Sequence, residues 1–181
     1  GKAFLRYSAD SNMKRVSLEC GGKSPHIVLA DAPDPDAIAE QVVWGAFFNQ
    51  GQVCHAGTRL VADRRVAPRL VERVIALAKD LRTGDPLDPR TQLGTLIDGA
   101  QTRRVLDYIA CGVRAGANLA AGGSPGTRAN TVEPTVFTGV DSRMTIAREE
   151  IFGPVLCVQD VDGAEEARSE EHTPELQSLS H

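Results

Sequence analysis

The sequence predicts an α/β domain with a mainly parallel β-sheet flanked by helices. Short apolar runs of strand length alternate along the chain with segments of helical periodicity, and glycine- and proline-rich turns separate most of them. The 181 residues suffice for one domain with a real core, since a chain of ~150 residues buries ~70% of its unfolded surface. Hydrophobic content of 41% and charged content of 24% are ordinary for a soluble globular protein.

The first half of the chain predicts two strands and a helix. Residues 13–19 alternate polar and apolar side chains, which is typical of a half-buried strand. The apolar run at 26–30, bounded by prolines, predicts a buried strand. Asp34 is expected to cap a helix with Pro35 in its first turn, and this helix should extend over residues 36–48.

The second half continues the alternation. We expect strands at residues 59–62, 132–138 and 155–158, another short strand between 112 and 126, and helices at 67–81 and 98–115. Within these elements Cys111, Cys157 and Trp44 are interpreted as packing residues, and His26 as an ordinary strand residue.

Charge and cysteine content exclude several classes of function. The net charge is −4 and the 20 basic residues are scattered, so no nucleic-acid partner is expected. No apolar run approaches the ~20 residues that span a bilayer, so no membrane partner is expected. The four cysteines show no metal-ligand spacing, which predicts no metal site. Cysteine usage and the lack of a signal peptide favour a reducing, cytoplasmic location.

Cys54 stands out among these cysteines. It lies on a glycine-flanked turn directly after an apolar helical run, whereas a thiol that only packs would lie inside such a run. We therefore interpret Cys54 as a nucleophile. Because an ordinary thiol is only a few per cent thiolate at neutral pH, it would need help from turn N–H groups or a nearby cation. Catalysis by a Cys54–His55 pair is not expected, since neighbours on a turn usually point apart.

Three segments resemble motifs of the NAD(P)-dependent aldehyde dehydrogenases. Residues 47–59 resemble the cysteine segment of that family. Residues 19–25 resemble its glutamate motif, with Cys20 in place of the usual leucine; Cys20 itself is interpreted as a packing residue. Glu150 and Phe152 match its Glu-x-Phe-Gly-Pro motif.

The resemblance implies a function and a role for each residue. Cys54 would attack a small aldehyde to form a thiohemiacetal and then a thioester, and Glu19 would act as the general base that activates the hydrolytic water. Glu150 would bind the ribose next to the nicotinamide of NAD or NADP, and Phe152 would pack against that ribose and ring. The opening residues 1–8 and the Glu19–Cys20 pair look most like the subgroup that acts on aminoaldehydes, including γ-glutamyl-aminobutyraldehyde.

The resemblance also implies a domain organisation. Residues 1–24 would be the end of a cofactor-binding domain and the crossover from it, and 25–167 a truncated catalytic domain. Residues 168–181 look unlike the family and are interpreted as an adapter-derived or disordered tail. The chain opens mid-pattern, as a fragment would, so these 181 residues alone are expected to be inactive and prone to aggregate. The full-length protein is expected to be a homo-oligomer.

Three other functions stay open at this point. One is a cofactor-free thiol hydrolase that uses Cys54 and Glu19, and another is a non-catalytic binding protein that keeps only the fold. The third is an acylating relative that transfers its thioester to coenzyme A. A phosphate-binding loop around Lys23 is rejected, because Ser17 occupies the position where that loop needs glycine.

Overall fold

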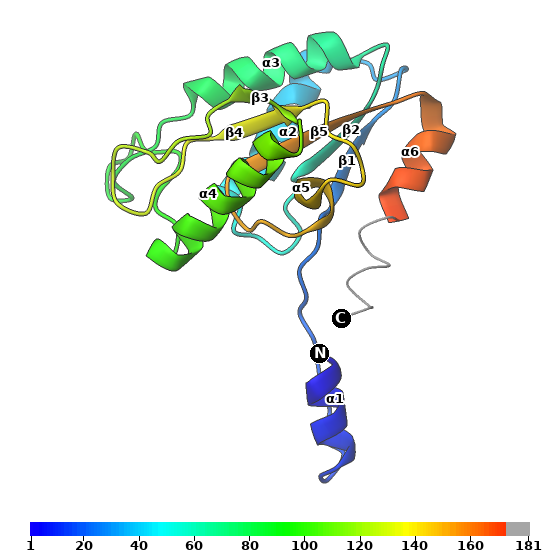
Figure 1. Cartoon of the computed structure of the whole chain (residues 1–181), viewed down its shortest axis with the longest axis vertical. Helices are drawn as coiled ribbons and strands as arrows, with labels where there is room; N and C mark the ends of the chain where they lie inside the picture. The colour runs from blue at the N-terminus through cyan, green and yellow to red at the C-terminus, as the bar shows by residue number, and fades with distance from the viewer. Residues whose placement is uncertain (173–181) are drawn as a thin grey trace.

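The computed structural model describes residues 1–172, whose strands form one five-stranded sheet with helices on both faces (Figure 1). The strands are β1 (Pro25–Val28), β2 (Arg59–Asp63), β3 (Asn118–Ala121), β4 (Thr135–Thr138) and β5 (Val155–Val161). The helices are α1 (Lys2–Ala9), α2 (Pro35–Phe47), the 3-10 turn η1 (Phe48–Gly51), α3 (Ala67–Asp80), α4 (Gly99–Arg114), α5 (Thr145–Arg148) and α6 (Gly163–His172).

The sheet order is β1-β2-β5-β4-β3, and only the β3–β4 pairing is antiparallel. The mainly parallel α/β fold that the sequence predicts is therefore confirmed. Strands β1, β2 and β5 are consecutive neighbours, with Pro25 opposite Arg59 and Arg59 opposite Cys157. This register aligns the amino ends of three strands that are distant in sequence.

Helices cover both faces of the sheet because successive strand residues point to opposite sides. Leu60 and Ala62 of β2 pack in a core with α2 and α3, whereas Val61 between them packs with Ala167 of α6. On the same side as α6, Cys157 of β5 packs with α4 and α5. The sequence interpretation of Cys157 as a core residue is confirmed.

Two helices begin at the aspartates that their sequence favours. The Asp34 carboxylate accepts hydrogen bonds from the N–H groups of Asp36 and Ala37, as predicted. The Asp98 carboxylate accepts one from Gln101 N–H at 2.7 Å and caps α4. Each carboxylate satisfies backbone donors that the first helical turn leaves unpaired.

The predicted strand at residues 13–19 is wrong. After α1, Met13 N–H bonds to the carbonyl of Ser8, so the chain reverses onto that helix. Almost every side chain of 13–19 is exposed, and the arm with α1 projects from the body (Figure 1). An alternating pattern needs a partner strand and a covered face, and no described strand pairs with this segment.

Two packing interpretations are also wrong. Trp44 is 67% exposed and stacks on Phe48 with ring centroids 4.8 Å apart. Helix α2 is apolar on nearly all sides, so its sequence did not distinguish the face that meets α3. Cys20 is exposed, because it lies on the arm, and Cys111 is only half-buried.

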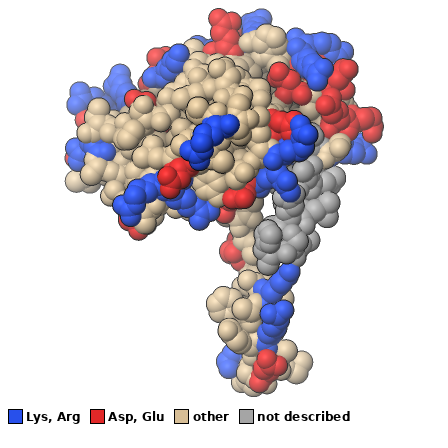
Figure 2. Space-filling model, viewed as in Figure 1, with Lys and Arg blue, Asp and Glu red and all other residues tan. Residues whose placement is uncertain are grey.

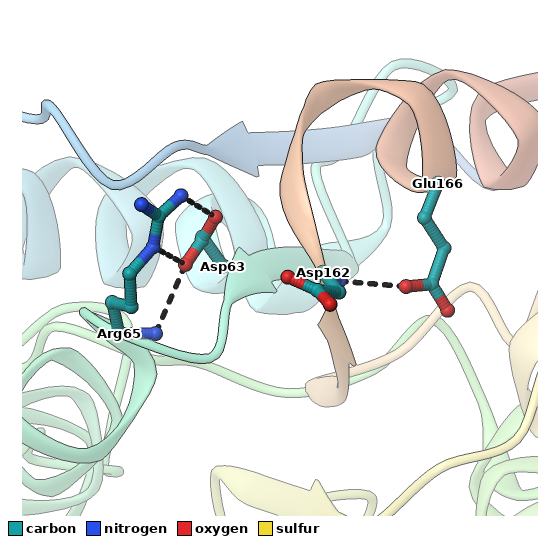
Figure 3. Close-up of polar contacts among 4 residues, drawn as sticks. All are labelled: Asp63, Arg65, Asp162 and Glu166. Carbon is teal, nitrogen blue, oxygen red and sulfur yellow. Dashed lines mark hydrogen bonds and ion pairs between the residues drawn. The ribbon is translucent and has the colours of Figure 1, made fainter.

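Helix α6 was not expected from the sequence and includes residues 168–172 of the expected tail. Its start is held against the end of β2 (Figure 3). There Asp63 accepts hydrogen bonds from Arg65 Nε and Nη2 at 2.9 and 2.8 Å, and from Gly163 N–H. These bonds, led by that of the Arg65 side chain, hold the pKa of Asp63 well below its usual value. Glu166 accepts from Asp162 N–H at 2.6 Å. The rest of the expected tail, 173–181, lies outside the described residues.

Charged side chains of both signs are interspersed over the face shown in Figure 2, which has no large patch of one sign. None of the helices in residues 1–172 combines the length and the apolar character needed to cross a bilayer. Across the same residues, no three His, Cys, Asp or Glu side chains gather as ligands of a metal ion.

Candidate active site

A left-handed turn presents Cys54. Asn49, Gln50 and Gly51 have φ values of +48°, +57° and +69°, so α2 ends abruptly and the chain reverses. For residues other than glycine this conformation costs ~1–2 kcal/mol each. Such strain concentrates at functional sites. The turn leaves Cys54 exposed, as the sequence predicts.

Polar contacts hold this turn from both sides. Asn49 Nδ2 donates to the carbonyl of Gln52 at 3.2 Å, and the Gln52 side-chain oxygen accepts from Ile97 N–H at 3.1 Å. Farther along, Gly57 N–H bonds to the carbonyl of Gly45 in α2 at 3.1 Å. The segment that carries the thiol is thus fastened to α2 and to the loop before α4.

His26 supports the turn from β1, a role that its sequence did not indicate. A Cβ atom on Gly57 would lie 1.8 Å from His26 Cδ2, and one on Gly45 would lie 2.6 Å from His26 Nε2. The imidazole therefore packs directly on two glycine backbones. Burial lowers the pKa of His26 below its ordinary value, so the ring is uncharged at neutral pH.

The thiol has one close polar neighbour within the described part of the chain. Cys54 Sγ lies 3.8 Å from His55 Nδ1. From the sequence these neighbours are expected to point apart, and the structure instead places them in contact at the long end of a sulfur hydrogen bond.

Glu150 connects the Glu-x-Phe-Gly-Pro motif to the glutamate motif at residues 19–25. Its Oε1 accepts a hydrogen bond from Gly22 N–H at 3.3 Å, across 128 residues of sequence. A Cβ on Gly21 would lie 2.1 Å from the same oxygen. The carboxylate therefore lies against the Gly21–Gly22 turn, directly after Glu19 and Cys20.

Gly51 connects the cysteine segment at residues 47–59 to the Glu-x-Phe-Gly-Pro motif. A Cβ on Gly51 would lie 2.3 Å from the carbonyl oxygen of Gly153. The Cys54 turn thus abuts the turn that contains Phe152, a residue in left-handed conformation with 37% of its surface exposed. All three motifs lead into β1, β2 and β5, so they meet at the amino ends of adjacent parallel strands. Open α/β sheets usually bind ligands at the opposite, carboxyl ends.

Glu19 is not brought into contact with Cys54. It lines a hollow of about 530 Å³ with residues of α1 and the arm, including Tyr7 and Lys14. Within the described residues, no hydrogen bond or ion pair joins Glu19 to Cys54. In this chain the structure unites the backbone next to Glu19 with Glu150, but not the Glu19 side chain with Cys54.

Lys23 is a buried residue whose burial the sequence did not indicate. It is 4% exposed, and its Nζ has no hydrogen-bond partner among residues 1–172. Burial lowers its pKa, a change opposed by Cys157 and by the Glu150 carboxylate and supported by Arg59. The only feature of the sequence that could have indicated this burial is the position of Lys23 directly after Gly21 and Gly22. The Lys23 amino group therefore lies within electrostatic range of the Glu150 carboxylate.

Comparison with known proteins finds similarity to one family along nearly the whole chain. The model of the aldehyde dehydrogenase family matches residues 1–171. An aminoacetaldehyde dehydrogenase of Pseudomonas aeruginosa is 45% identical over 168 residues, which are 92% of this chain and 34% of that protein. Mouse retinal dehydrogenase 2 is 47% identical over 156 residues, 86% of this chain and 30% of that protein.

Solved structures agree. An indole-3-acetaldehyde dehydrogenase of Pseudomonas syringae, in complex with NAD⁺, superposes with a TM-score of 0.91 at 48% identity; the match covers 94% of this chain and 35% of that one. The chain thus spans about a third of the length of the relatives it matches. Family model, sequence identity and fold coincide, and this chain belongs to the aldehyde dehydrogenase family.

Proposed function

We propose that the protein containing this chain oxidises an aldehyde to a carboxylic acid with NAD or NADP, and that Cys54 is its nucleophile. The observation that carries this proposal is the convergence of the three motifs at the amino ends of β1, β2 and β5. The pairing of these strands does not require a cysteine, a carboxylate and a phenylalanine with a positive φ to lie together at the amino ends of the strands.

The residues divide the chemistry between them. The Cys54 thiolate adds to the aldehyde carbon, a C–S bond forms, and the carbonyl oxygen becomes an oxyanion that nearby backbone N–H groups stabilise. The oxyanion then re-forms the C=O bond as hydride leaves the former aldehyde carbon, so that a thioester on Cys54 remains; NAD or NADP, when bound, would accept this hydride. Glu19 then takes a proton from the water that attacks the thioester, which releases the acid and restores the thiolate.

Glu150 suits the cofactor role that we propose for it. One of its oxygens is fixed by Gly22 N–H, and the other makes no hydrogen bond within residues 1–172. A half-buried carboxylate held in this way can accept hydrogen bonds from a ribose diol. The exposed side of Phe152 offers an apolar surface beside it.

We also propose the division between residues 1–24 and 25–167 as a domain boundary. The arm that carries α1 buries none of that helix's side chains and pairs with no described strand of the sheet. In this proposal the Glu19 carboxylate reaches Cys54 once a cofactor-binding domain holds the arm in place. The 181 residues alone are accordingly expected to be inactive.

The test uses the complete reading frame and follows NADH formation at 340 nm. Cys54→Ser should abolish turnover. Glu19→Gln should keep a first burst of NADH but reduce steady turnover by ~10²–10⁴-fold, because only the hydrolytic step loses its base. Unchanged turnover in Cys54→Ser would overturn the assignment.

We propose an aminoaldehyde as the substrate class. Support comes from the relative named as an aminoacetaldehyde dehydrogenase and from a Burkholderia cenocepacia structure named as a γ-glutamyl-γ-aminobutyraldehyde dehydrogenase, which is 44% identical. Comparison of kcat/KM for an ω-aminoaldehyde with that for the unsubstituted aldehyde of equal length tests this. A preference for the unsubstituted aldehyde would count against it.

We further propose a cytoplasmic homo-oligomer. The described cysteines are all free thiols, as a reducing compartment requires. The exposed, stacked Trp44 and Phe48 give an apolar surface of the kind that subunit contacts cover. Light scattering of the complete protein should show more than one copy, and a monomer at micromolar concentration would refute the assembly.

The contact between Cys54 and His55 favours one alternative, a cofactor-free thiol hydrolase. In that case an imidazole beside the thiol would assist attack on an ester. Three results together would support the alternative over our proposal. Ester hydrolysis would persist without NAD, Cys54→Ser would abolish it, and the protein would not oxidise aldehydes.

A further inference from the structure

One face of α4 contacts every residue of the segment 149–152. Gln101 Nε2 donates to the carbonyls of Ile151 and Phe152 at 3.0 and 2.8 Å. One turn later, Arg104 Nη2 donates to the carbonyl of Glu150 at 3.2 Å. After another turn, Tyr108 Oη donates to Glu149 Oε2 at 2.7 Å. These three donors follow helical spacing, so they form one stripe along the helix.

The stripe is continuous with apolar packing. A Cβ on Gly153 would lie 2.4 Å from Val105 Cγ2, so Val105 extends the contact to the end of the turn. The Arg104 guanidinium lies 5.5 Å from the centre of the Tyr108 ring, within cation–π range. These contacts restrict the orientation of Arg104 and Tyr108.

The segment needs such support, because it lies between α5 and β5 without regular structure of its own. Phe152 has a φ of +57°, a conformation that an isolated chain would rarely populate. Glu150, in turn, must keep its carboxylate on Gly22 N–H. External hydrogen bonds to consecutive residues supply what the local sequence lacks.

We propose that Tyr108 is a positioning residue: its hydrogen bond to Glu149, together with the Gln101 and Arg104 bonds, holds Glu150 and Phe152 where the cofactor binds. The part that concerns the cofactor rests on the function proposed above. Tyr108 acts through Glu149 and needs no contact with the cofactor. Burial, and then the Glu149 carboxylate, raise the pKa of Tyr108, so its hydroxyl stays a donor at neutral pH.

The first test uses the 181-residue chain and needs no activity. The chain has two tyrosines, so Tyr7→Phe leaves Tyr108 as the only one to titrate in absorbance at 295 nm. Glu149→Gln in that background should lower the titration midpoint, because a neighbouring negative charge is lost. The matched control is Glu133→Gln, which removes an exposed carboxylate elsewhere and should leave the midpoint unchanged. Equal midpoints in all three chains would overturn the contact.

The second test uses the complete protein. Tyr108→Phe should raise the KM for the cofactor about fivefold, the amount expected for loss of one hydrogen bond, with kcat within a factor of two. The same KM should follow Glu149→Ala, which removes the acceptor of this hydrogen bond, and the double variant should add nothing further. An unchanged KM with a lower melting temperature would reduce Tyr108 to a structural role and overturn the proposal. A complete protein that never oxidises aldehydes would refute the proposed function, while the titration would still decide the contact.

Discussion

Gly51→Ala is expected to damage the junction between the Cys54 turn and the Gly153 turn. Gly51 has a φ of +69°, and an added Cβ would lie 2.3 Å from the carbonyl oxygen of Gly153 and 3.1 Å from that of Ala46. Both are backbone atoms, which cannot rotate away as a side chain would. The substitution therefore adds a steric cost to the conformational one.

The chain provides a control that separates these two costs. Gly139 has nearly the same φ, +63°, but no described atom lies within 4 Å of the position that an added Cβ would take. Gly139→Ala should then lose only the conformational term, ~1–2 kcal/mol of unfolding free energy. Gly51→Ala should lose that amount plus ~1–3 kcal/mol for overpacking against backbone. The effect of alanine on the unfolded chain is similar in both variants and cancels.

Urea unfolding followed by far-ultraviolet circular dichroism measures the difference. With a slope of ~1–3 kcal/mol per molar urea, an extra ~1 kcal/mol moves the midpoint of Gly51→Ala below that of Gly139→Ala by about 0.3–1 M. Coincident midpoints at equal slope would show that Gly51 and Gly153 are not packed as the structure places them.

Three further outcomes follow from buried groups. Because the pKa of His26 is lowered from 6.5, its stabilising effect is complete above that pH and is lost as the pH falls through the lower folded-state pKa; between pH 7.5 and 5 His26→Gln should therefore lose less unfolding free energy than wild type. A dependence on pH for His26→Gln equal to that of wild type would contradict this expectation. Phe137→Ala empties a fully buried site and should cost ~3–5 kcal/mol in urea unfolding, whereas a loss below ~1 kcal/mol would mean that the site collapses. Lys23→Met should leave stability at pH 7 equal or higher, since it removes a buried amino group that has no hydrogen-bond partner among the described residues; a lower melting temperature would show that the interactions of this amino group with nearby charged groups outweigh the burial cost.

Local sequence determined the elements and the motifs. Helical periodicity located α2 and α4 to within a residue or two, and Asp34 was identified as the residue that caps α2. The turn chemistry around Cys54 identified an exposed thiol. These features depend on neighbours a few positions away, so the sequence expresses them directly.

Sequence patterns gave wrong predictions where the structure of a segment depended on contacts with residues far away in the sequence. Residues 13–19 alternate as a strand does, yet no described strand lies beside them. Helix α2 is apolar nearly all round, and only its packing against α3 leaves Trp44 outside. The proposed meeting of Glu19 with Cys54 is not made within this chain and stays a prediction.

The tertiary structure alone decided where the motifs meet and what holds them. The order β1-β2-β5 places their amino ends side by side, and one face of α4 fixes the segment around Glu150. Strand order and helix docking arise from burial of apolar surface between segments far apart in sequence. Because that burial is a property of the whole packed core, no local pattern encodes it.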